Sequence, residues 1–275
     1  MVAIVTDSAA NLPGALVAEL GIEVVPMYLM FGDRVYRDGV DMAPEDLYQR
    51  LVTRSVTATT STPSPGDFLD AYRRAGQDEI VCVTVAASMS SAHHEATLAA
   101  ERFGGRVEVV DSGIASMAEG FVALEAARRA ATGGSLSEVA ERARDVAAKA
   151  RICAAIDTFE FLRRSGRVKK LQAYAATMLD IKPVFRMAAG EVGPVARPRT
   201  RRRAIDRVVQ ETLEEIGDRP VHLSAIHAAA EADARQLIVS IGERATVVES
   251  HVVAVTPVVG AHTGPGLVGT AFFCE

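Results

Sequence analysis

The chain contains no tryptophan, and only 5% of its 275 residues are aromatic. Its three cysteines, Cys82, Cys153 and Cys274, stand far apart, each within an apolar run. They form no disulfide framework and no CxxC metal motif, so we interpret them as small core residues and expect no metal site. No apolar run reaches the roughly 18 residues that a membrane-spanning helix needs, and the N-terminus does not resemble a secretory signal. We therefore expect a cytoplasmic protein without stable membrane insertion.

Positive charge is also scarce, since the formal net charge is −5 at pH 7. An acidic balance argues against general affinity for nucleic acids, so no nucleic-acid partner is expected. In contrast, 49% of the residues are hydrophobic, which is enough to bury a sizeable core. The class that remains is a globular protein of one large domain or two smaller ones.

Short apolar strands alternate with helices in the first half of the chain. Strands are predicted at residues 2–5, 22–30, 79–86 and 107–110, with helices starting near residues 13, 44, 64, 90 and 115. Asn11 is expected to cap the first helix, with Pro13 at its first position, and Ser64 and Asp67 resemble a capping box. This alternation predicts a parallel sheet with helices on both faces.

The alternation of predicted strands and helices becomes less regular after residue 150. Strands are predicted at residues 152–156, 182–187, 221–228 and 246–255, with helices interleaved. The overall prediction is an α/β protein of two domains. Residues 1–150 would form a three-layer domain with a parallel sheet, and residues 151–275 would form an α/β domain with a mixed sheet.

Hydroxyl side chains crowd two segments that follow predicted strands. Residues 57–64 contain six of them, at Thr57, Thr59, Thr60, Ser61, Thr62 and Ser64. The second segment, "AASMSSA" at residues 86–92, enters the next helix. Ligands of open α/β sheets bind beyond the carboxyl ends of strands, where helix N-termini expose N–H groups. These segments could hold a carboxylate or phosphate monoanion, or they could simply cap turns and helices.

The C-terminal stretch "VVGAHTGPGLVG" combines four glycines with His262. Glycines allow the backbone to approach a ligand closely, and histidine titrates near neutral pH, but no phosphate-loop signature is present. A triad of Asp7, Ser8 and His262 is disfavoured because the chain has no nucleophile elbow. The adjacent His93 and His94 point in different directions on a helix, which argues against a metal site there.

Arginines cluster in two segments of the second half, "LRRSGRVKK" at residues 162–170 and "RPRTRRRAIDR" at residues 197–207. Such clusters are commonly solvated helix faces. They can also dock an acidic protein surface or a phosphate.

Taken in order, seven blocks resemble the DegV family of bacterial fatty-acid-binding proteins, also called FakB: "VTDSAANLP", "TTSTPSPGDF", "VVDSGIAS", "FLRRSGRV", "IKPVF" with "GEV", "RTRRRAI" and "AHTGPGLVG". The resemblance covers essentially the whole chain. It implies a fatty acid held in a tunnel between two domains, with its carboxylate bonded by hydroxyls and a histidine. It also implies a separate ATP-dependent fatty acid kinase that converts the presented acid to an acyl-phosphate.

Residue by residue, the family's "TTS" motif falls on Thr59, Thr60 and Ser61, and its C-terminal histidine falls on His262. The resemblance assigns these four residues to the carboxylate and Arg167 and Arg199 to the kinase-docking surface. Where the family's second motif reads S-S-x-x-S-G-T, this chain has alanines at its first two positions. Either Ser88 or a water molecule is then the substitute contact, or the head group is held more loosely or differs chemically.

Two hypotheses follow. The first is a monomeric carrier of a long-chain fatty acid, without a cofactor and without catalytic turnover of its own. The alternative is a binding protein or an enzyme that acts on another small carboxylate or phosphate, as the changed second motif would allow.

Overall fold

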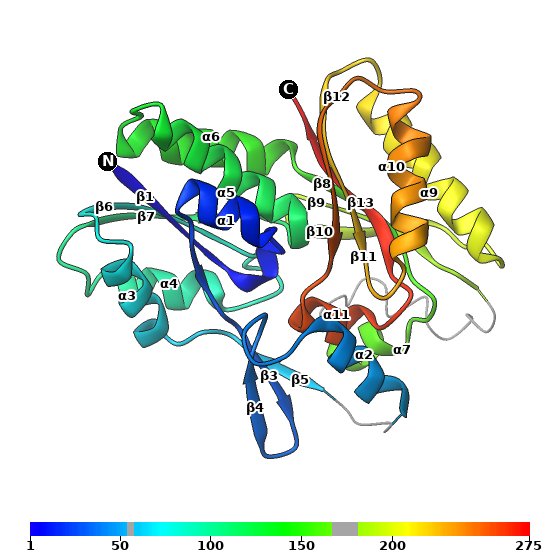
Figure 1. Cartoon of the computed structure of the whole chain (residues 1–275), viewed down its shortest axis with the longest axis horizontal. Helices are drawn as coiled ribbons and strands as arrows, with labels where there is room; N and C mark the ends of the chain where they lie inside the picture. Colours follow the sequence, from blue (N-terminus) through cyan, green and yellow to red (C-terminus); the bar gives the residue numbers. More distant parts are fainter. Residues whose placement is uncertain (54–57, 167–180) are drawn as a thin grey trace.

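A computed structural model describes residues 1–53, 58–166 and 181–275. Its two main sheets lie side by side, each with its own helices, and a small third sheet projects below them (Figure 1). This arrangement confirms the predicted α/β class, with a parallel sheet in the first half and a mixed sheet in the second.

The first sheet has four parallel strands in the order β2-β1-β6-β7. Its strands are β1 (Val2–Asp7), β2 (Glu23–Val25), β6 (Glu79–Thr84) and β7 (Arg106–Asp111). Helices α3 (Pro65–Arg74) and α4 (Ala92–Ala100) cover one face, and α5 (Ser116–Ala131) and α6 (Leu136–Lys149) cover the other (Figure 1). Ser64 caps α3 in the predicted capping box with Asp67.

The second sheet has six strands in the order β10-β9-β8-β13-β11-β12, with only β11 and β12 parallel. Its strands are β8 (Arg151–Ala155), β9 (Val184–Ala188), β10 (Glu191–Ala196), β11 (Val221–His227), β12 (Val247–Ala254) and β13 (Val268–Cys274). Helices α9 (Arg201–Ile216) and α10 (Glu231–Gly242) cover one face. The opposite face turns toward α5 and the first sheet (Figure 1).

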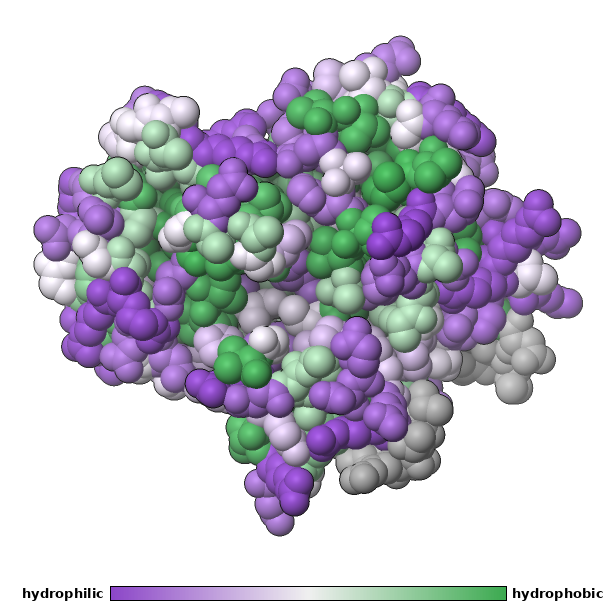
Figure 2. Space-filling model, viewed as in Figure 1, coloured by the Kyte–Doolittle hydropathy of each residue, from purple (hydrophilic) through white to green (hydrophobic). Residues whose placement is uncertain are grey.

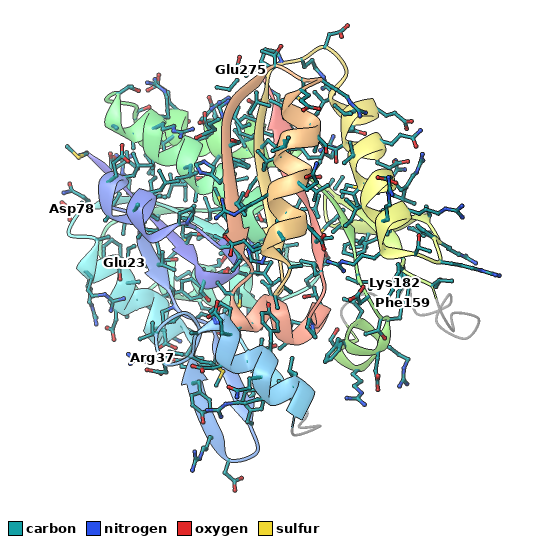
Figure 3. The ribbon with its side chains drawn as sticks, turned by 45° about the vertical axis from the view of Figure 1, so that its right-hand side comes forward. Glu23, Arg37, Asp78, Phe159, Lys182 and Glu275 are labelled. Carbon is teal, nitrogen blue, oxygen red and sulfur yellow. The ribbon has the colours of Figure 1, made fainter. Side chains whose placement is uncertain are left out.

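A third, antiparallel sheet in the order β4-β3-β5 corrects the prediction of one strand at residues 22–30. Pro26 cannot donate a ladder hydrogen bond, and the chain divides there into β2 and β3 (Tyr28–Phe31) of different sheets. β3 pairs with β4 (Arg34–Arg37) and with β5 (Thr59–Ser61). Hydrophilic side chains gather at the tip of this projection (Figure 2), which lies far from the C-terminal Glu275 (Figure 3).

Five short helices complete the described part of the chain: η1 (Ser8–Ala10), α1 (Gly14–Leu20), α2 (Pro44–Thr53), α7 (Glu160–Ser165) and α11 (Pro257–Thr263). Asn11 does not cap α1 as expected. It ends η1 in the left-handed conformation, with φ 54°, a conformation that asparagine tolerates. Pro13 is the residue that precedes α1.

Strand alternation decides which face of the six-stranded sheet is available to a ligand. On β8, Cys153 and Ala155 pack with the α9 and α10 side, whereas Ile152 and Ala154 join the core shared with the first sheet. β9 places Phe185 in that shared core in the same way. Successive strand residues point to opposite faces, so one apolar face lies between the two sheets.

Candidate functional site

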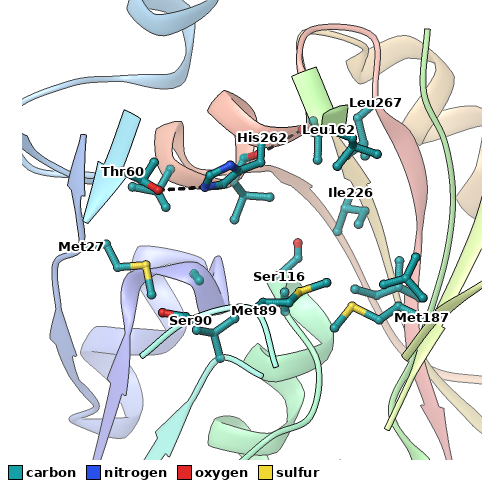
Figure 4. Close-up of a pocket in the computed structure, with 18 of the residues that line it drawn as sticks. Met27, Thr60, Met89, Ser90, Ser116, Leu162, Met187, Ile226, His262 and Leu267 are labelled. Carbon is teal, nitrogen blue, oxygen red and sulfur yellow. Dashed lines mark hydrogen bonds between the residues drawn. The ribbon is translucent and has the colours of Figure 1, made fainter. Parts of the chain in front are cut away.

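A cavity of about 440 Å³ lies between the two main sheets. This volume is within the range of roughly 300–1,000 Å³ that is common for small-molecule sites. Most of its lining is apolar: Ile152, Ala154, Phe185, Met187 and Ile226 come from the six-stranded sheet, and Val85, Met89 and Ala115 come from loops of the first sheet. The close-up in Figure 4 shows these walls meeting around a space into which Thr60 and His262 also project.

Thr60 and His262 form a hydrogen-bonded polar pair in the lining of the cavity. The Thr60 Oγ1 atom lies 2.9 Å from His262 Nε2, and both side chains are half-buried (Figure 4). Thr60 is the middle residue of β5 and the least exposed of that strand. His262 lies in the last turn of α11, so the glycine-rich C-terminal stretch contributes a helix and not only a loop. Thr60 and His262 are 202 positions apart in the sequence, so their spacing gave no geometric sign of this contact.

The position of α11 depends on a buried carboxyl group that the sequence did not single out. Asp38 Oδ1 accepts a hydrogen bond from the Val258 amide at 2.9 Å, and Asp38 Oδ2 accepts one from Ser8 Oγ at 2.7 Å. Gly260 also fits closely, because a Cβ there would lie 2.6 Å from the Tyr48 hydroxyl. Both contacts fix the helix that carries His262.

Further hydroxyls surround this pair at the same end of the cavity. Thr62 Oγ1 and Ser91 Oγ lie 3.3 Å apart and join the two hydroxyl-rich segments. Ser61 and Ser90 also line the cavity. Ser90 and Ser91 belong to the "AASMSSA" segment, and the presence of both in a loop before a helix was the available signal for them.

The structure places the other predicted hydroxyl contacts outside the cavity lining. Thr59 is exposed, and Ser88 donates a hydrogen bond to the Gly190 carbonyl at 2.9 Å. Ala86 is buried, with its amide bonded to the Ile114 carbonyl, and Ala87 is exposed, with its amide bonded to Asp111. Neither of the two alanines that depart from the family motif lines the cavity.

Buried acids lie behind the first-sheet side of the cavity. Burial raises the pKa of Asp7 from 3.8 to about 6, although the amides of Val85 and Ala9 donate to its carboxyl group. Burial, together with the neighbouring charge of Asp7, raises the pKa of Glu119 well above its usual value. Desolvation penalises the charged form, so burial favours the protonated carboxyl group of Glu119.

The geometry excludes the nucleophilic triad considered from sequence. The Ser8 hydroxyl donates to Asp38, and Asp7 accepts hydrogen bonds from two backbone amides, so neither side chain pairs with His262 in the described structure. His93, which the sequence analysis considered as a metal ligand, has its Nδ1 atom 3.3 Å from Thr84 Oγ1.

The three cysteines are buried, and burial raises the pKa of Cys82 to about 12, so that thiol is unreactive at neutral pH.

One group of potential metal ligands occurs away from the cavity, formed by Glu125, His222 and Glu249, whose ligand atoms lie within 4.8 Å of one another. Arg128 forms two hydrogen bonds with Glu249, at 2.6 and 2.7 Å, and also pairs with Glu125. Burial opposes ionisation of Glu249, yet its bonds with Arg128 and His222 hold its pKa well below the usual value. The acids already have cationic partners, so this group joins α5 to β12 as an ion-pair network.

The structure describes only one of the two arginines assigned to docking. Arg199 is exposed just before α9. Arg167 lies outside the described residues. Among residues that the structure describes, no helix combines the length and apolar character needed to cross a membrane.

Comparison with known proteins agrees with this geometry. A family model described as uncharacterised protein, DegV family, matches residues 1–275. A DegV domain-containing protein of Streptomyces coelicolor is 38% identical over 272 residues, which span 98% of this chain and 96% of that protein.

Solved structures share the whole architecture. A structure described as fatty acid binding of a DegV family protein from Thermus thermophilus has a TM-score of 0.92 and 30% identity, and the match covers 100% of this chain and 99% of that one. DegV of Bacillus subtilis, described as a fatty acid binding protein, has a TM-score of 0.88, 24% identity and the same coverage. At the latter identity, the similarity establishes the fold alone.

Proposed function

The chain belongs to the DegV family, and on this premise we propose that it binds a fatty acid in the cavity between its two main sheets. The observation that carries the proposal is the division of one cavity into an apolar interior and a hydroxyl-rich end with a histidine. The fatty acid binding described for the related Thermus thermophilus protein supports it.

The carboxylate would lie at the polar end, with Thr60, Ser61, Ser90 and His262 as its contacts. Hydroxyl and imidazole donors stabilise the carboxylate without a paired arginine, so its oxygen keeps more of its nucleophilicity. The acyl chain would lie against the sheet face, where each buried CH₂ contributes about 0.8 kcal/mol. Thr59 and Ser88 do not line the cavity in this structure. Their expected contacts with the carboxylate therefore stay predictions.

We further propose that the protein does not itself catalyse a reaction and presents the acid to a separate ATP-dependent fatty acid kinase. The exposed Arg199 supports a docking surface for an acidic partner near the start of α9. A monomer suffices for this role. The proposed domain boundary lies between α6 and β8, near residues 149–152.

Native mass spectrometry of the purified protein tests the binding proposal, followed by denaturation and identification of any released molecule. A stoichiometric fatty acid supports it. If no lipid is present even after incubation with a mixed fatty-acid pool, the alternative becomes the better account, namely a site for another small carboxylate or phosphate.

The kinase step needs its own test. With a fatty acid kinase and ATP, Arg199→Glu should retain bound acid but slow acyl-phosphate formation, because a reversed charge repels an acidic docking surface. Transfer at the unchanged rate would contradict the docking role of Arg199. A matched control is Arg244→Glu, an exposed arginine that follows the end of α10.

A further inference from the structure

Ser116 differs from every other hydroxyl residue of the cavity. It is only 2% exposed, it lines the cavity, and its Oγ atom has no hydrogen-bond partner among the described residues. Hydrogen bonds are present for each of the other cavity hydroxyls, which are Thr60, Ser61, Thr62, Ser90, Ser91 and Thr263. A buried hydroxyl without a partner costs free energy, so a ligand atom that bonded it would gain affinity.

The backbone at Ser116 is also unusual. Ser116 begins α5 with φ 56°, a left-handed value that is uncommon for residues other than glycine. The preceding Ala115 offers no side-chain cap, so the N-terminal amides of this 16-residue helix receive no bond from that residue. Ser116 and the start of α5 therefore form a polar point in a wall that is otherwise mainly apolar.

This polar point is separate from the Thr60 and His262 pair. In Figure 4, Thr60 and His262 lie together at one side, whereas the Ser116 hydroxyl projects into the cavity from the α5 side, near Met89. The carboxylate of the proposed fatty acid would bind Thr60 and His262. Another part of the same molecule would contact Ser116.

The surroundings of Ser116 favour a neutral ligand atom. Glu119 follows one turn later on α5, and both Glu119 and Asp7 are fully buried. Burial, and after it the charge of Asp7, raises the pKa of Glu119, so a further negative charge is unfavourable there. A second carboxylate would meet the same repulsion, whereas a hydroxyl or carbonyl oxygen would not.

We propose that Ser116 is a specificity-determining contact, and that the cavity selects a fatty acid that carries a hydroxyl or keto oxygen on its chain. This inference rests on the proposed function and goes beyond it by naming the class of acyl chain. Sites that bond a ligand oxygen discriminate strongly against the analogue that lacks it, because their own polar group is then left unpaired.

The test compares dissociation constants for octadecanoic acid and for a positional series of its monohydroxy derivatives, measured by displacement of a fluorescent fatty acid. In the unmodified protein, at least one positional isomer should bind about tenfold more tightly than octadecanoic acid. Ser116→Ala should remove that preference, so that octadecanoic acid and its isomers have similar dissociation constants. Ser137→Ala, on the exposed surface of α6, is the matched control and should keep the preference.

A second variant protects the test against misfolding. Ser116→Gly also removes the hydroxyl but suits the left-handed backbone, so it should fold at least as well as the unmodified protein while losing the preference. The inference is overturned if octadecanoic acid binds and no isomer is preferred, or if the preference survives in both variants. If neither octadecanoic acid nor any isomer binds, the fatty acid function fails as well.

Discussion

The two main sheets contribute to the cavity in different ways. The six-stranded mixed sheet presents a face, so its contribution is the alternate apolar side chains of neighbouring strands, such as Ile152 and Ala154 on β8. The four-stranded parallel sheet presents the carboxyl ends of its strands, so its contribution is loops and helix starts, which include Ser90 and Ser116. Sheet faces bury apolar groups, whereas strand ends lead into loops and helix starts that carry hydroxyl and backbone N–H groups.

This difference explains how one cavity can bind a ligand that has an apolar chain and a polar head group. Affinity would come mainly from the sheet face, and orientation from the loops together with β5 and α11, which carry Thr60 and His262. The comparison predicts large losses when the face is altered and smaller losses when a single polar contact is removed.

The largest effect is expected from a charge on the sheet face. Met187→Asp places a carboxylate in the apolar wall, at a residue only 3% exposed, so we expect at least about a hundredfold weaker fatty acid binding. Displacement of a fluorescent fatty acid measures the loss. The adjacent Arg186 is exposed, so Arg186→Asp is the matched control and should bind normally. Equal affinity in both variants would show that this face does not hold the chain.

The acids behind the loop wall should give a pH dependence of stability. The pKa of Asp7 is about 6 in the folded protein and 3.8 in a solvated chain, so the folded state holds its proton longer. Raising the pH through this window therefore lowers the free energy of unfolding, by an amount on the order of 3 kcal/mol. Chemical denaturation at several pH values should show this slope, and Asp7→Asn should flatten it.

The slope is the informative quantity in that experiment. Asparagine provides one fewer acceptor for the amides of Val85 and Ala9, so Asp7→Asn should be less stable at acid pH, and the difference should narrow as the pH rises. An unchanged slope in the variant would mean that Asp7 does not titrate in this window.

A single head-group contact should have a smaller effect. Thr60→Val keeps the shape of the side chain but removes its hydroxyl, so fatty acid affinity should fall about tenfold while the melting temperature stays close to that of the unmodified protein. His262→Ala should act in the same direction. Thr59→Val, one residue earlier on β5 but exposed, should cause a smaller loss of affinity. A larger loss for Thr59→Val than for Thr60→Val would reverse the assignment.

The smallest effect is expected where the two sheets are joined by charge. A double-mutant cycle with Arg128→Met and Glu249→Gln should give a coupling energy of about 1 kcal/mol, because Arg128 is partly exposed and solvent screens the pair. Denaturant unfolding of the four proteins measures it, and the coupling should weaken at high salt. A coupling energy of zero would mean that this network does not stabilise the junction.

Much of the fold could be read from local patterns. Alternating apolar strands and helices predicted the parallel sheet, and the Ser64 capping box was visible in four residues because its bonds are local. The failures at residues 22–30 and at Asn11 both involve partners distant in sequence, since the Asn11 side chain donates a hydrogen bond to the Ala254 carbonyl. Pro26 divides a continuous apolar run, and the two resulting strands join different sheets, which depends on partners distant in sequence.

The candidate site divides in the same way. The sequence by itself determined its chemistry, since hydroxyl clusters before helices and a histidine in a glycine-rich stretch are properties of residue type and order. It also determined the family through blocks spread over the whole chain. The sequence did not determine which hydroxyls face the cavity, because strand direction and the neighbouring elements decide this. Only the tertiary structure brought Thr60 to His262, turned Ser88 toward Gly190 and left Ser116 buried in the wall without a partner, because each outcome depends on contacts between segments far apart in the chain.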